Sequence, residues 1–344
     1  MHRSPALSPG IGVIGAGFIS RYHLEGLRSA GADVRSVCSR KLANARARSD
    51  EYDIADATDD LDRLLSRDDI NAVVIATPDA THEELTIRAA AAGKSILLQK
   101  PMGLDVGQCR RMIEAAENHG VGLYVSFMHR YFEEVQALRS LLRRGELGRI
   151  LSVRQRNATP GADWAAWFYS RDNVGGGVMM QLGVHGIDLL RYLFGEIDEA
   201  AAATALTTPQ RTLASGEIVE PDTEDLVLAT YRFASGLMAS HEVSYNEVAG
   251  TDRFRLEVYG EEGTAWLRSE RGRFAVYTTE DGRWTTPVKA IDDDPGPAQH
   301  RHFLAMLTGE APDDGSARDG LFATAIADAV YRSAADRPWT GIDT

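Results

Sequence analysis

Cysteine is scarce in this sequence: its 344 residues include only Cys38 and Cys109, and no CxxC pair occurs. Neither a disulfide framework nor a cysteine-based zinc site is therefore expected. Long hydrophobic runs are also missing, since no segment approaches the roughly 20 apolar residues of a membrane span. The first nine residues lack the apolar segment of a secretory signal. These absences predict a protein of the cytoplasm.

Basic side chains are in the minority: Lys and Arg total 37 against 50 Asp and Glu, which gives a formal net charge of -13. Binding to nucleic acid or to an anionic membrane relies on clustered Lys and Arg, so neither partner is expected. No metal is expected either, because His300 and His302 form an HxH pair without a carboxylate or cysteine at ligand spacing.

What the sequence does have is a glycine-rich turn that joins an apolar run to a helical pattern. Gly15 allows the tight turn, and Gly17 lets the main chain approach a pyrophosphate. The helix that follows begins at Phe18 and Ile19 and offers free amides with a partial positive charge. The turn predicts a dinucleotide site, although Ser20 stands where the fingerprint has Gly or Ala. Ordinary strand-to-helix turns also contain glycine, so the turn alone leaves that alternative open.

The length of the chain predicts two domains, because 344 residues exceed one ordinary core. In residues 1–128, short apolar, β-branched runs alternate with helical patterns, which predicts an α/β Rossmann domain with a parallel sheet covered on both faces. The expected strands are Ile11–Ile14, Val34–Cys38, Ala72–Ala76, Ser95–Leu98 and Val121–Phe127, and the clearest helices are His82–Ala92 and Val106–His119.

The remaining residues, 129–344, show alternating segments separated by turn residues, which favours antiparallel strands joined by hairpins. We expect a second, α+β domain built on a mostly antiparallel sheet. The expected strands are Ile150–Asn157, Leu226–Phe233, Leu237–Tyr245, Phe254–Tyr259, Thr264–Leu267 and Phe274–Tyr277, and the helices are Glu133–Arg144, Val178–Phe194, Gln299–Leu307 and Leu321–Ala334.

Further motifs occur in a fixed order along nearly the whole chain, and together they resemble the Gfo/Idh/MocA family of glucose-fructose oxidoreductases and inositol dehydrogenases. The resemblance implies that a large open sheet in the second domain supports a substrate pocket and the contacts of a homodimer or homotetramer. The motifs are Gly12 to Gly17 with His23 downstream, Ala76-Thr77-Pro78 followed by His82, Ala92-Gly93-Lys94, Gln99-Lys100-Pro101, Gly145 to Gly148, Trp167 before Gly175-Gly176-Gly177, and Gly183-Val184-His185-Gly186-Ile187-Asp188.

The end of the second expected strand bears on which nicotinamide cofactor fits. Cys38-Ser39-Arg40 contains no carboxylate to accept hydrogen bonds from the ribose hydroxyls of NAD. Ser39 and Arg40 can instead donate to a 2′-phosphate and neutralise it. The sequence therefore favours NADP over NAD. The alternative is that Arg40 covers the adenine face, which is compatible with either cofactor.

Thr77 and Pro78 end an apolar strand, at the place where a doubly wound sheet binds the nicotinamide half of its ligand. The resemblance makes Thr77, Pro78 and His82 part of the cofactor lining. His82 is equally well interpreted as the first-turn residue of a surface helix. His23, near the phosphate turn, is at least as well interpreted as a packing residue.

Lys100 follows a buried strand, and Pro101 fixes the backbone just after it, so the ammonium group is expected at the carboxyl end of the strand, pointing into the cleft. The resemblance makes Lys100 the catalytic residue that orients the substrate hydroxyl near the nicotinamide. This chain has Gln99 where the family motif has Glu. The amide keeps a hydrogen bond to the nicotinamide ribose but removes a negative charge.

His185 follows Gln181 by four residues on the expected helix, so both side chains should project from one face towards the cofactor domain. Gly183 and Gly186 keep that face shallow. The resemblance makes His185 the catalytic base and puts Gln181 where relatives commonly have an acid. The imidazolium formed when His185 accepts a proton is then stabilised only by dipoles, unless Asp188 supplies the charge.

These residues together predict an NAD(P)-dependent oxidoreductase that transfers hydride between nicotinamide and a secondary hydroxyl or carbonyl of a sugar, cyclitol or related polyol. Arg130 at the pocket mouth and Trp167 as a flat apolar face would join Lys100, Gln181 and His185 in binding the substrate. Burial of the aromatic residues in the core is an equally good interpretation. Two other functions stay open: a glycoside-cleaving enzyme of the same fold that reoxidises its cofactor within each cycle, and a cofactor-binding protein without turnover.

Overall fold

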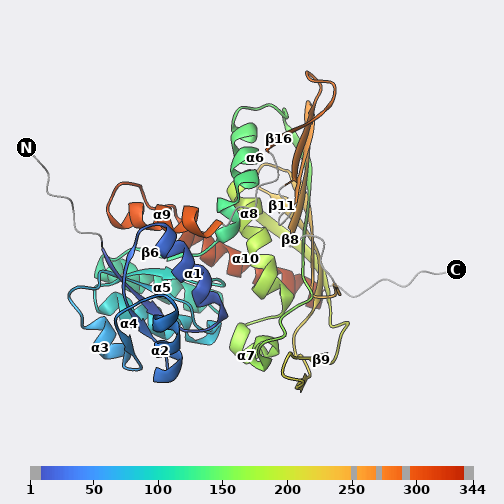
Figure 1. The fold of residues 1–344 in the computed structure, drawn as a ribbon. Helices are drawn as coiled ribbons and strands as arrows, with labels where there is room; N and C mark the ends of the chain where they lie inside the picture. Colours follow the sequence, from blue (N-terminus) through green and yellow to red (C-terminus); the bar gives the residue numbers. More distant parts are fainter. Residues whose placement is uncertain (1–8, 249–253, 269–272, 289–294, 337–344) are drawn as a thin grey trace, which may run out of the picture. The chain divides into compact units, whose positions relative to one another are not determined.

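A computed structural model of the chain contains two compact units, each with its own large sheet (Figure 1). The first unit comprises residues 1–131 and 294–321, and the second comprises residues 132–293 and 322–344. Among the residues described, no helix is both long and apolar enough to span a membrane. The structure describes residues 9–248, 254–268, 273–288 and 295–336.

The first unit contains a parallel sheet of six strands in the order β3-β2-β1-β4-β5-β6, which confirms the predicted Rossmann fold. Strands β1 and β4 are buried along their whole length because helices cover both faces of the sheet. The strands are β1 Gly10–Ile14, β2 Asp33–Cys38, β3 Ala57–Thr58, β4 Ala72–Ile75, β5 Ser95–Leu98 and β6 Leu123–Val125, and the helices are α1 Phe18–Ser29, α2 Leu42–Glu51, α3 Leu61–Leu65, α4 His82–Ala91, α5 Val106–His119 and α9 Pro295–Leu307.

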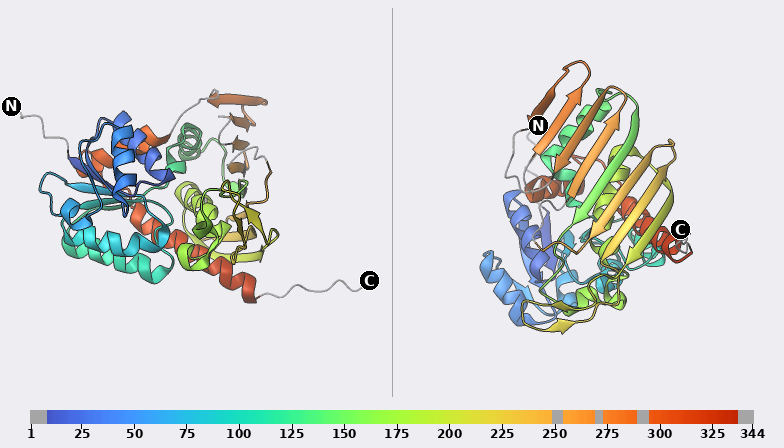
Figure 2. Two further views of the ribbon diagram at one scale, coloured as in Figure 1. Left: turned by 60° about the horizontal axis from the view of Figure 1, so that its bottom comes forward. Right: turned by 90° about the vertical axis from the view of Figure 1, so that its right-hand side faces the viewer.

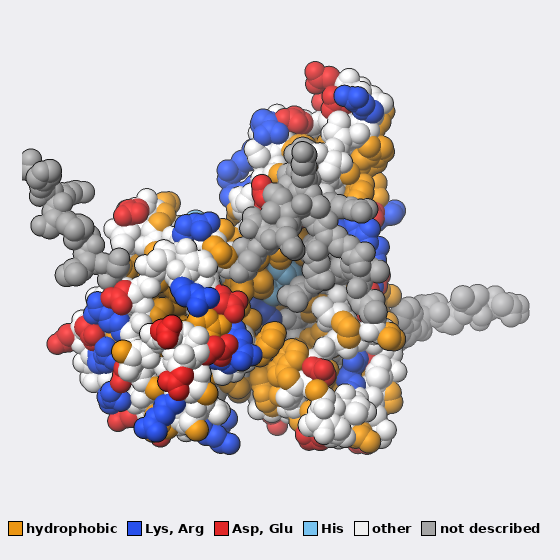
Figure 3. Space-filling model, in the orientation of Figure 1, with side chains coloured by type: hydrophobic (Ala, Val, Ile, Leu, Met, Phe, Trp, Pro, Cys, Tyr) orange, Lys and Arg blue, Asp and Glu red, His pale blue; other side chains and the backbone are white. Residues whose placement is uncertain are grey.

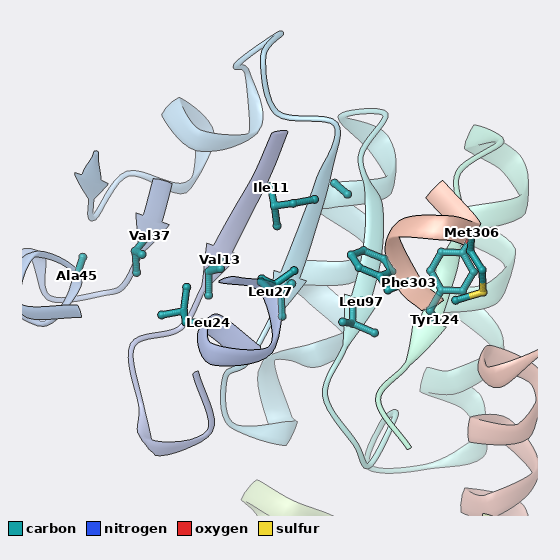
Figure 4. Close-up of a cluster of buried hydrophobic side chains, with 12 residues drawn as sticks. Ile11, Val13, Leu24, Leu27, Val37, Ala45, Leu97, Tyr124, Phe303 and Met306 are labelled. Carbon is teal, nitrogen blue, oxygen red and sulfur yellow. The ribbon is translucent and has the colours of Figure 1, made fainter. Parts of the chain in front are cut away.

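Helix α9 belongs to the core of the first unit although it lies far along the chain. Figure 4 shows its residues Phe303 and Met306 beside Leu97 and Tyr124 of the sheet. The rings of Phe303 and Tyr124 meet edge to face, with their centroids 5.7 Å apart. The expected domain boundary after residue 128 places α9 in the second domain, whereas these contacts group it with the first. The physical reason is burial, since Phe303 has no exposed surface there.

The second unit contains a mixed sheet of eight strands in the order β16-β15-β14-β13-β7-β12-β11-β8. All neighbouring strands are antiparallel except β7 and β12, which confirms a mostly antiparallel sheet. In Figure 2 (right) one face of this sheet is turned to the viewer, and the helices lie behind it. The strands are β7 Ile150–Ala158, β8 Ile197–Ala205, β11 Leu226–Phe233, β12 Met238–Ser244, β13 Phe254–Gly260, β14 Gly263–Arg268, β15 Arg273–Thr278 and β16 Trp284–Val288, and the helices are α6 Glu133–Arg143, α7 Arg171–Val174, α8 Val184–Phe194 and most of α10 Ser316–Asp336, which begins in the first unit.

Strand β8 was not expected from the sequence. Five of its nine residues are alanine, which has a low preference for strands and gives no alternating pattern. It forms because β11 pairs with it in antiparallel register from Leu226 to Phe233. The pairing places β8 at the edge of the sheet.

Candidate functional site

The glycine-rich turn follows β1 and leads into α1. Gly15 has a φ of 112°, and a Cβ added there would lie 2.2 Å from the main-chain oxygen of Ala76, so only glycine fits. A Cβ added to Gly17 would meet no atom of the described residues within 4 Å. Phe18, the first residue of α1, is 66% exposed, and the first turn of α1 has no acidic side chain. The open space beside Gly17 and the start of a helix that lacks an acidic first turn fit the pyrophosphate of a dinucleotide.

Arg48 of α2 holds this turn from behind, and sequence reasoning missed it. Its side chain is 9% exposed, and Nη2 donates to the main-chain oxygens of Ala16 (3.1 Å) and Gly17 (3.3 Å). Nη1 of the same guanidinium pairs with Glu51 at 2.5 Å. The carbonyl oxygens of Ala16 and Gly17, which would repel an anion bound at the turn, therefore face the Arg48 guanidinium instead.

At the end of β2, Ser39 is partly buried and Arg40 is exposed. Burial, followed by the carboxylates of Asp59 and Asp60, raises the pKa of Cys38 to about 11. The thiol therefore stays protonated and is a poor nucleophile. The two aspartates were missed in the sequence because they follow the two-residue strand β3. They add negative charge near the position where Arg40 was expected to receive a phosphate.

His82 connects the ends of two neighbouring strands. It is fully buried at the start of α4, with Nδ1 2.9 Å from the main-chain oxygen of Pro101 and Nε2 3.1 Å from that of Thr77. Thr81 adds a hydrogen bond from its hydroxyl to that of Thr77, at 2.7 Å. His82 therefore fixes the backbone of the predicted cofactor residues Thr77 and Pro78. His82 is the first residue of α4, as its alternative interpretation has it, and its side chain lies on the buried side of that helix.

Lys100 emerges at the carboxyl end of β5, as predicted, and is partly buried. Its peptide bond to Pro101 is cis. The neighbouring Gln99 is 7% exposed, and its side-chain oxygen accepts a hydrogen bond from the main-chain N–H of Lys100 at 2.8 Å. The amide at position 99 thus supports the backbone from which Lys100 projects.

His23 packs against α9, which agrees with its interpretation as a structural residue. Its Nδ1 lies 3.0 Å from Nε2 of His300, and Nδ1 of His300 lies 2.6 Å from the main-chain oxygen of Gly296. Burial, and then the proximity of His300, lowers the pKa of His23 well below its usual value. On the same helices, the hydroxyl of Tyr22 donates to Gln299. These contacts fix α9 on α1.

In the second unit, the helix that carries Gln181 and His185 is not the regular helix that was expected. Residues Met179–Gly183 form a π-helical turn, and α8 follows directly from it. A π turn is wider than an α turn, and residues four apart still lie close to one face of it, so the shared direction of Gln181 and His185 stays a prediction. Both side chains are buried, at 6% and 4% exposure. Such turns are frequent at functional sites.

A row of buried polar side chains lies beneath α8, where Gly186 packs closely. A Cβ on Gly186 would lie 2.3 Å from Oδ1 of Asn157 and 2.5 Å from Nε2 of His241. His241 lies 2.8 Å from that Asn157 oxygen and 3.1 Å from the hydroxyl of Tyr231. Burial lowers the pKa of His241 to about 3, so the ring is neutral. The close contact explains the glycine that follows His185.

The predicted substrate residues Arg130 and Trp167 lie in different units. Arg130 is 4% exposed, forms an ion pair with Asp319 at 2.5 Å and lies over the ring of Phe127. Trp167 is partly buried and packs edge to face on Phe168, with ring centroids 5.9 Å apart. These contacts give both residues a packing role, and their contact with a substrate stays a prediction.

Charged side chains of both signs are interspersed over the first unit on the face shown in Figure 3. Many of them form local ion pairs. Arg35 pairs with Asp33 at 2.6 Å, and Arg88 pairs with Asp62 at 2.6 Å. These exposed pairs contribute little to stability.

Comparison with known proteins gives relatives that match nearly the whole chain. Levoglucosan dehydrogenase of Pseudarthrobacter phenanthrenivorans is 27% identical, over 96% of this chain and 97% of its own length. An inositol 2-dehydrogenase of Acidothermus cellulolyticus is 30% identical, over 94% of this chain and 92% of its own. A solved structure of a levoglucosan dehydrogenase in complex with NADH and levoglucosan superposes with a TM-score of 0.86 at 25% identity, covering 95% of this chain and 97% of that one.

The fold and these matches define an NAD-binding oxidoreductase. The chain belongs to the Gfo/Idh/MocA family, which confirms the predicted resemblance. Residues 10–127 match the oxidoreductase family model described as an NAD-binding Rossmann fold, and residues 135–266 match the GFO/IDH/MocA C-terminal domain.

Proposed function

We propose that the protein transfers hydride between NAD(P) and a secondary hydroxyl or carbonyl group of a sugar, cyclitol or related polyol. The observation that carries this proposal is the similarity, along nearly the whole chain, to relatives named as levoglucosan and inositol dehydrogenases. Another relative is named as a 1,5-anhydro-D-fructose reductase. None of these names describes glycoside cleavage, so that alternative is not favoured.

In the proposed reaction, two side chains act on the same substrate hydroxyl. Lys100 donates a hydrogen bond to the oxygen and stabilises the negative charge that develops on it. His185 accepts the hydroxyl proton during oxidation and returns it during reduction. Gln181 orients His185 or the substrate, and Arg130 and Trp167 complete the substrate contacts.

A nicotinamide cofactor supplies the hydride acceptor or donor when it is bound. The open space beside Gly17 and the exposed Phe18 at the start of α1 support binding of the pyrophosphate there. His82 holds the backbone at the ends of β4 and β5. The proposed cofactor residues are Gly15, Gly17, Phe18, Ile19, Ser39, Arg40, Thr77, Pro78, His82, Gln99 and Lys100.

The test is a turnover screen of the purified protein with NAD and NADP against sugars, sugar acids, inositols and glycosides. We expect reduced cofactor to accumulate with at least one free polyol. Failure to reduce either cofactor with any polyol, despite cofactor binding, would contradict the proposal. Release of an aglycone without net cofactor consumption would point instead to glycoside cleavage.

We propose NADP as the preferred cofactor, because Ser39 and the exposed Arg40 follow β2. Asp59 and Asp60 act in the opposite direction, since carboxylates repel a 2′-phosphate. Comparing kcat/KM for NADP and NAD decides between them. Loss of a charge-assisted contact in Arg40→Ala should lower the NADP-to-NAD ratio by about 10-fold. A clear NAD preference in the unmodified protein would overturn this choice.

We also propose that the protein is a homodimer or homotetramer joined through the face of the eight-stranded sheet that points away from α8. The alternation of β11 supports this, because Tyr231 points to the buried polar row under α8 while Leu228 is 51% exposed on the other face. Light scattering coupled to size exclusion measures the mass in solution. A monomer at micromolar concentration would contradict the proposal.

A further inference from the structure

The three consecutive glycines before the π-helical turn are needed for separate reasons. Gly175 ends α7 with a φ of 69°, in the left-handed region. A Cβ added to Gly176 would lie 2.2 Å from the hydroxyl of Tyr331. One added to Gly177 would lie 2.0 Å from the main-chain oxygen of Glu224. Two of the glycines therefore allow Glu224 and Tyr331 to approach the start of this helical segment.

Glu224 provides acceptors for three consecutive main-chain amides. Its carboxylate accepts hydrogen bonds from the N–H groups of Gly177 (3.0 Å) and Met179 (3.1 Å). Its main-chain oxygen accepts one from Val178 at 3.0 Å. The hydroxyl of Tyr331 donates to the same carboxylate at 2.8 Å. The first amides of a helix have no partner within the helix, and the helix dipole favours a carboxylate at this end.

The carboxylate of Glu224 is buried, with the residue 8% exposed. Burial raises the pKa of Glu224, and the hydrogen bonds from Met179, Tyr331 and Gly177 partly oppose that rise. Burial and the nearby carboxylate raise the pKa of Tyr331 well above its usual value, so its hydroxyl keeps the proton that it donates. Loss of either side chain leaves buried polar groups without partners, which is costly.

From these amides the helical path runs without a break to His185. The N–H of Gln181 donates to the main-chain oxygen of Gly177 at 3.0 Å, and α8 continues from the π turn. One residue after His185, Gly186 packs against the side chain of Asn157. His185 thus lies between a set of hydrogen bonds at the start of the segment and a close contact beneath α8.

We propose that Glu224 and Tyr331 are positioning residues that hold this helical segment in the place where His185 can exchange the substrate proton. The inference rests on the proposed function. Neither residue acts on the substrate directly. A displacement of about 1 Å at a reacting group can lower a rate by roughly 10²-fold, so loosening the segment lowers kcat. Cofactor binding is unaffected, because the proposed cofactor residues belong to the first unit.

The test compares Glu224→Gln and Tyr331→Phe with the neighbouring variant Asp225→Asn. Glutamine has nearly the size of glutamate, but its amide nitrogen cannot accept a hydrogen bond. Asp225 is a matched control because it is also buried, at 2% exposure, yet its carboxylate accepts hydrogen bonds from the main-chain N–H groups of Thr207 (2.7 Å) and Thr208 (2.9 Å). Asp225 therefore stabilises the loop at residues 207–208, and its replacement should not disturb the helical segment.

We expect kcat to fall about 10- to 100-fold in Glu224→Gln and about 3-fold in Tyr331→Phe, at temperatures where the proteins are folded. KM for the cofactor should stay within about 2-fold, and Asp225→Asn should keep kcat within about 2-fold. Hydrogen exchange should accelerate at residues 177–183 in Glu224→Gln, and to a smaller extent in Tyr331→Phe, but not in Asp225→Asn.

A normal kcat in both folded variants, or unchanged exchange at residues 177–183, overturns the inference. If Glu224→Gln fails to fold, Tyr331→Phe decides by the same two measurements. Absence of turnover in the unmodified protein would instead refute the proposed function, and the exchange comparison would still decide whether Glu224 holds the segment.

Discussion

The two units place their functional residues in opposite ways. In the first unit, the predicted cofactor residues follow directly from strand ends, and buried side chains such as His82 and Arg48 support the main chain from behind. In the second unit, His185 lies on a helix whose position depends on Glu224 and Tyr331, from a strand-flanking loop and the last helix. The supporting contacts of the first unit join residues up to 32 positions apart, whereas those of the second join residues 47 and 107 positions apart. Replacing a supporting residue should therefore weaken cofactor binding in the first unit, and should displace His185 in the second.

Removal of either proposed catalytic side chain should have the largest effect. Lys100→Ala and His185→Ala should each lower kcat by about 10²- to 10⁴-fold, because each loses a group that acts in the transition state. Steady-state kinetics measures kcat, and fluorescence titration of the cofactor tests whether its Kd is nearly unchanged. Near-normal turnover in either variant would remove that residue from the mechanism.

Glycine substitutions sharpen the contrast between the units. Gly17→Ala should leave the melting temperature nearly unchanged, since its Cβ meets open space, but should weaken cofactor binding by at least about 10-fold. Gly177→Ala should lower stability by about 3 kcal/mol, because its Cβ would overlap the main chain of Glu224. Thermal unfolding and cofactor titration measure both effects. If Gly17→Ala destabilised the fold, or Gly177→Ala did not, the contrast would be wrong.

Acid should weaken the second unit through His241. Its folded-state pKa of about 3 lies below the unfolded value, so the unfolded chain binds more protons as the pH falls. The stability is fully present above about pH 6.5, and roughly 2 kcal/mol of it is lost by about pH 5. Urea unfolding across this pH range measures the slope of the unfolding free energy against pH.

The variant His241→Gln should reduce that slope by about one proton, while the exposed control His119→Gln should leave it unchanged. An identical pH dependence in all three proteins would show that His241 does not titrate as its burial implies. His23, whose pKa is also lowered, contributes in the same direction in the first unit and stays in all three proteins.

The smallest expected effect comes from two arginines that share one partner. Arg48 and Arg21 both pair with Glu51, but only Arg48 is buried and reaches the main chain of the glycine turn. Arg48→Ala should weaken cofactor binding about 3- to 5-fold and lower the melting temperature. Arg21→Ala should change neither, because its pair is exposed. Equal effects in the two variants would mean that the turn does not depend on Arg48.

The sequence predicted best what is encoded locally. The glycine turn, the strand before Lys100 and the helix starting at His82 each depend on neighbours a few residues away, and the structure has them where the patterns indicated. Contacts between distant segments were missed. Nothing in the pattern of α2 links Arg48 to a turn 31 residues earlier, and nothing in α9 links Phe303 to the Rossmann core.

In the second unit, the missed features share a physical cause. The π turn has the same composition as an α-helix, so apolar periodicity does not distinguish them. Glu224 lies in an acidic, turn-rich stretch that gives no sign of burial. The triple glycine was the one visible signal, since three glycines beside a helix are unfavourable unless another chain segment packs against them. That signal indicated a close contact but not which residue makes it.

The place of α9 in the first unit has a consequence for how the protein is made. The ribosome releases the first 131 residues long before α9, so one flank of the apolar layer of the sheet stays uncovered while residues 132–293 of the second unit are translated. Until Phe303 and Met306 have been synthesised, the nascent Rossmann unit exposes apolar surface to which chaperones can bind. A chain truncated after residue 131 never covers that surface.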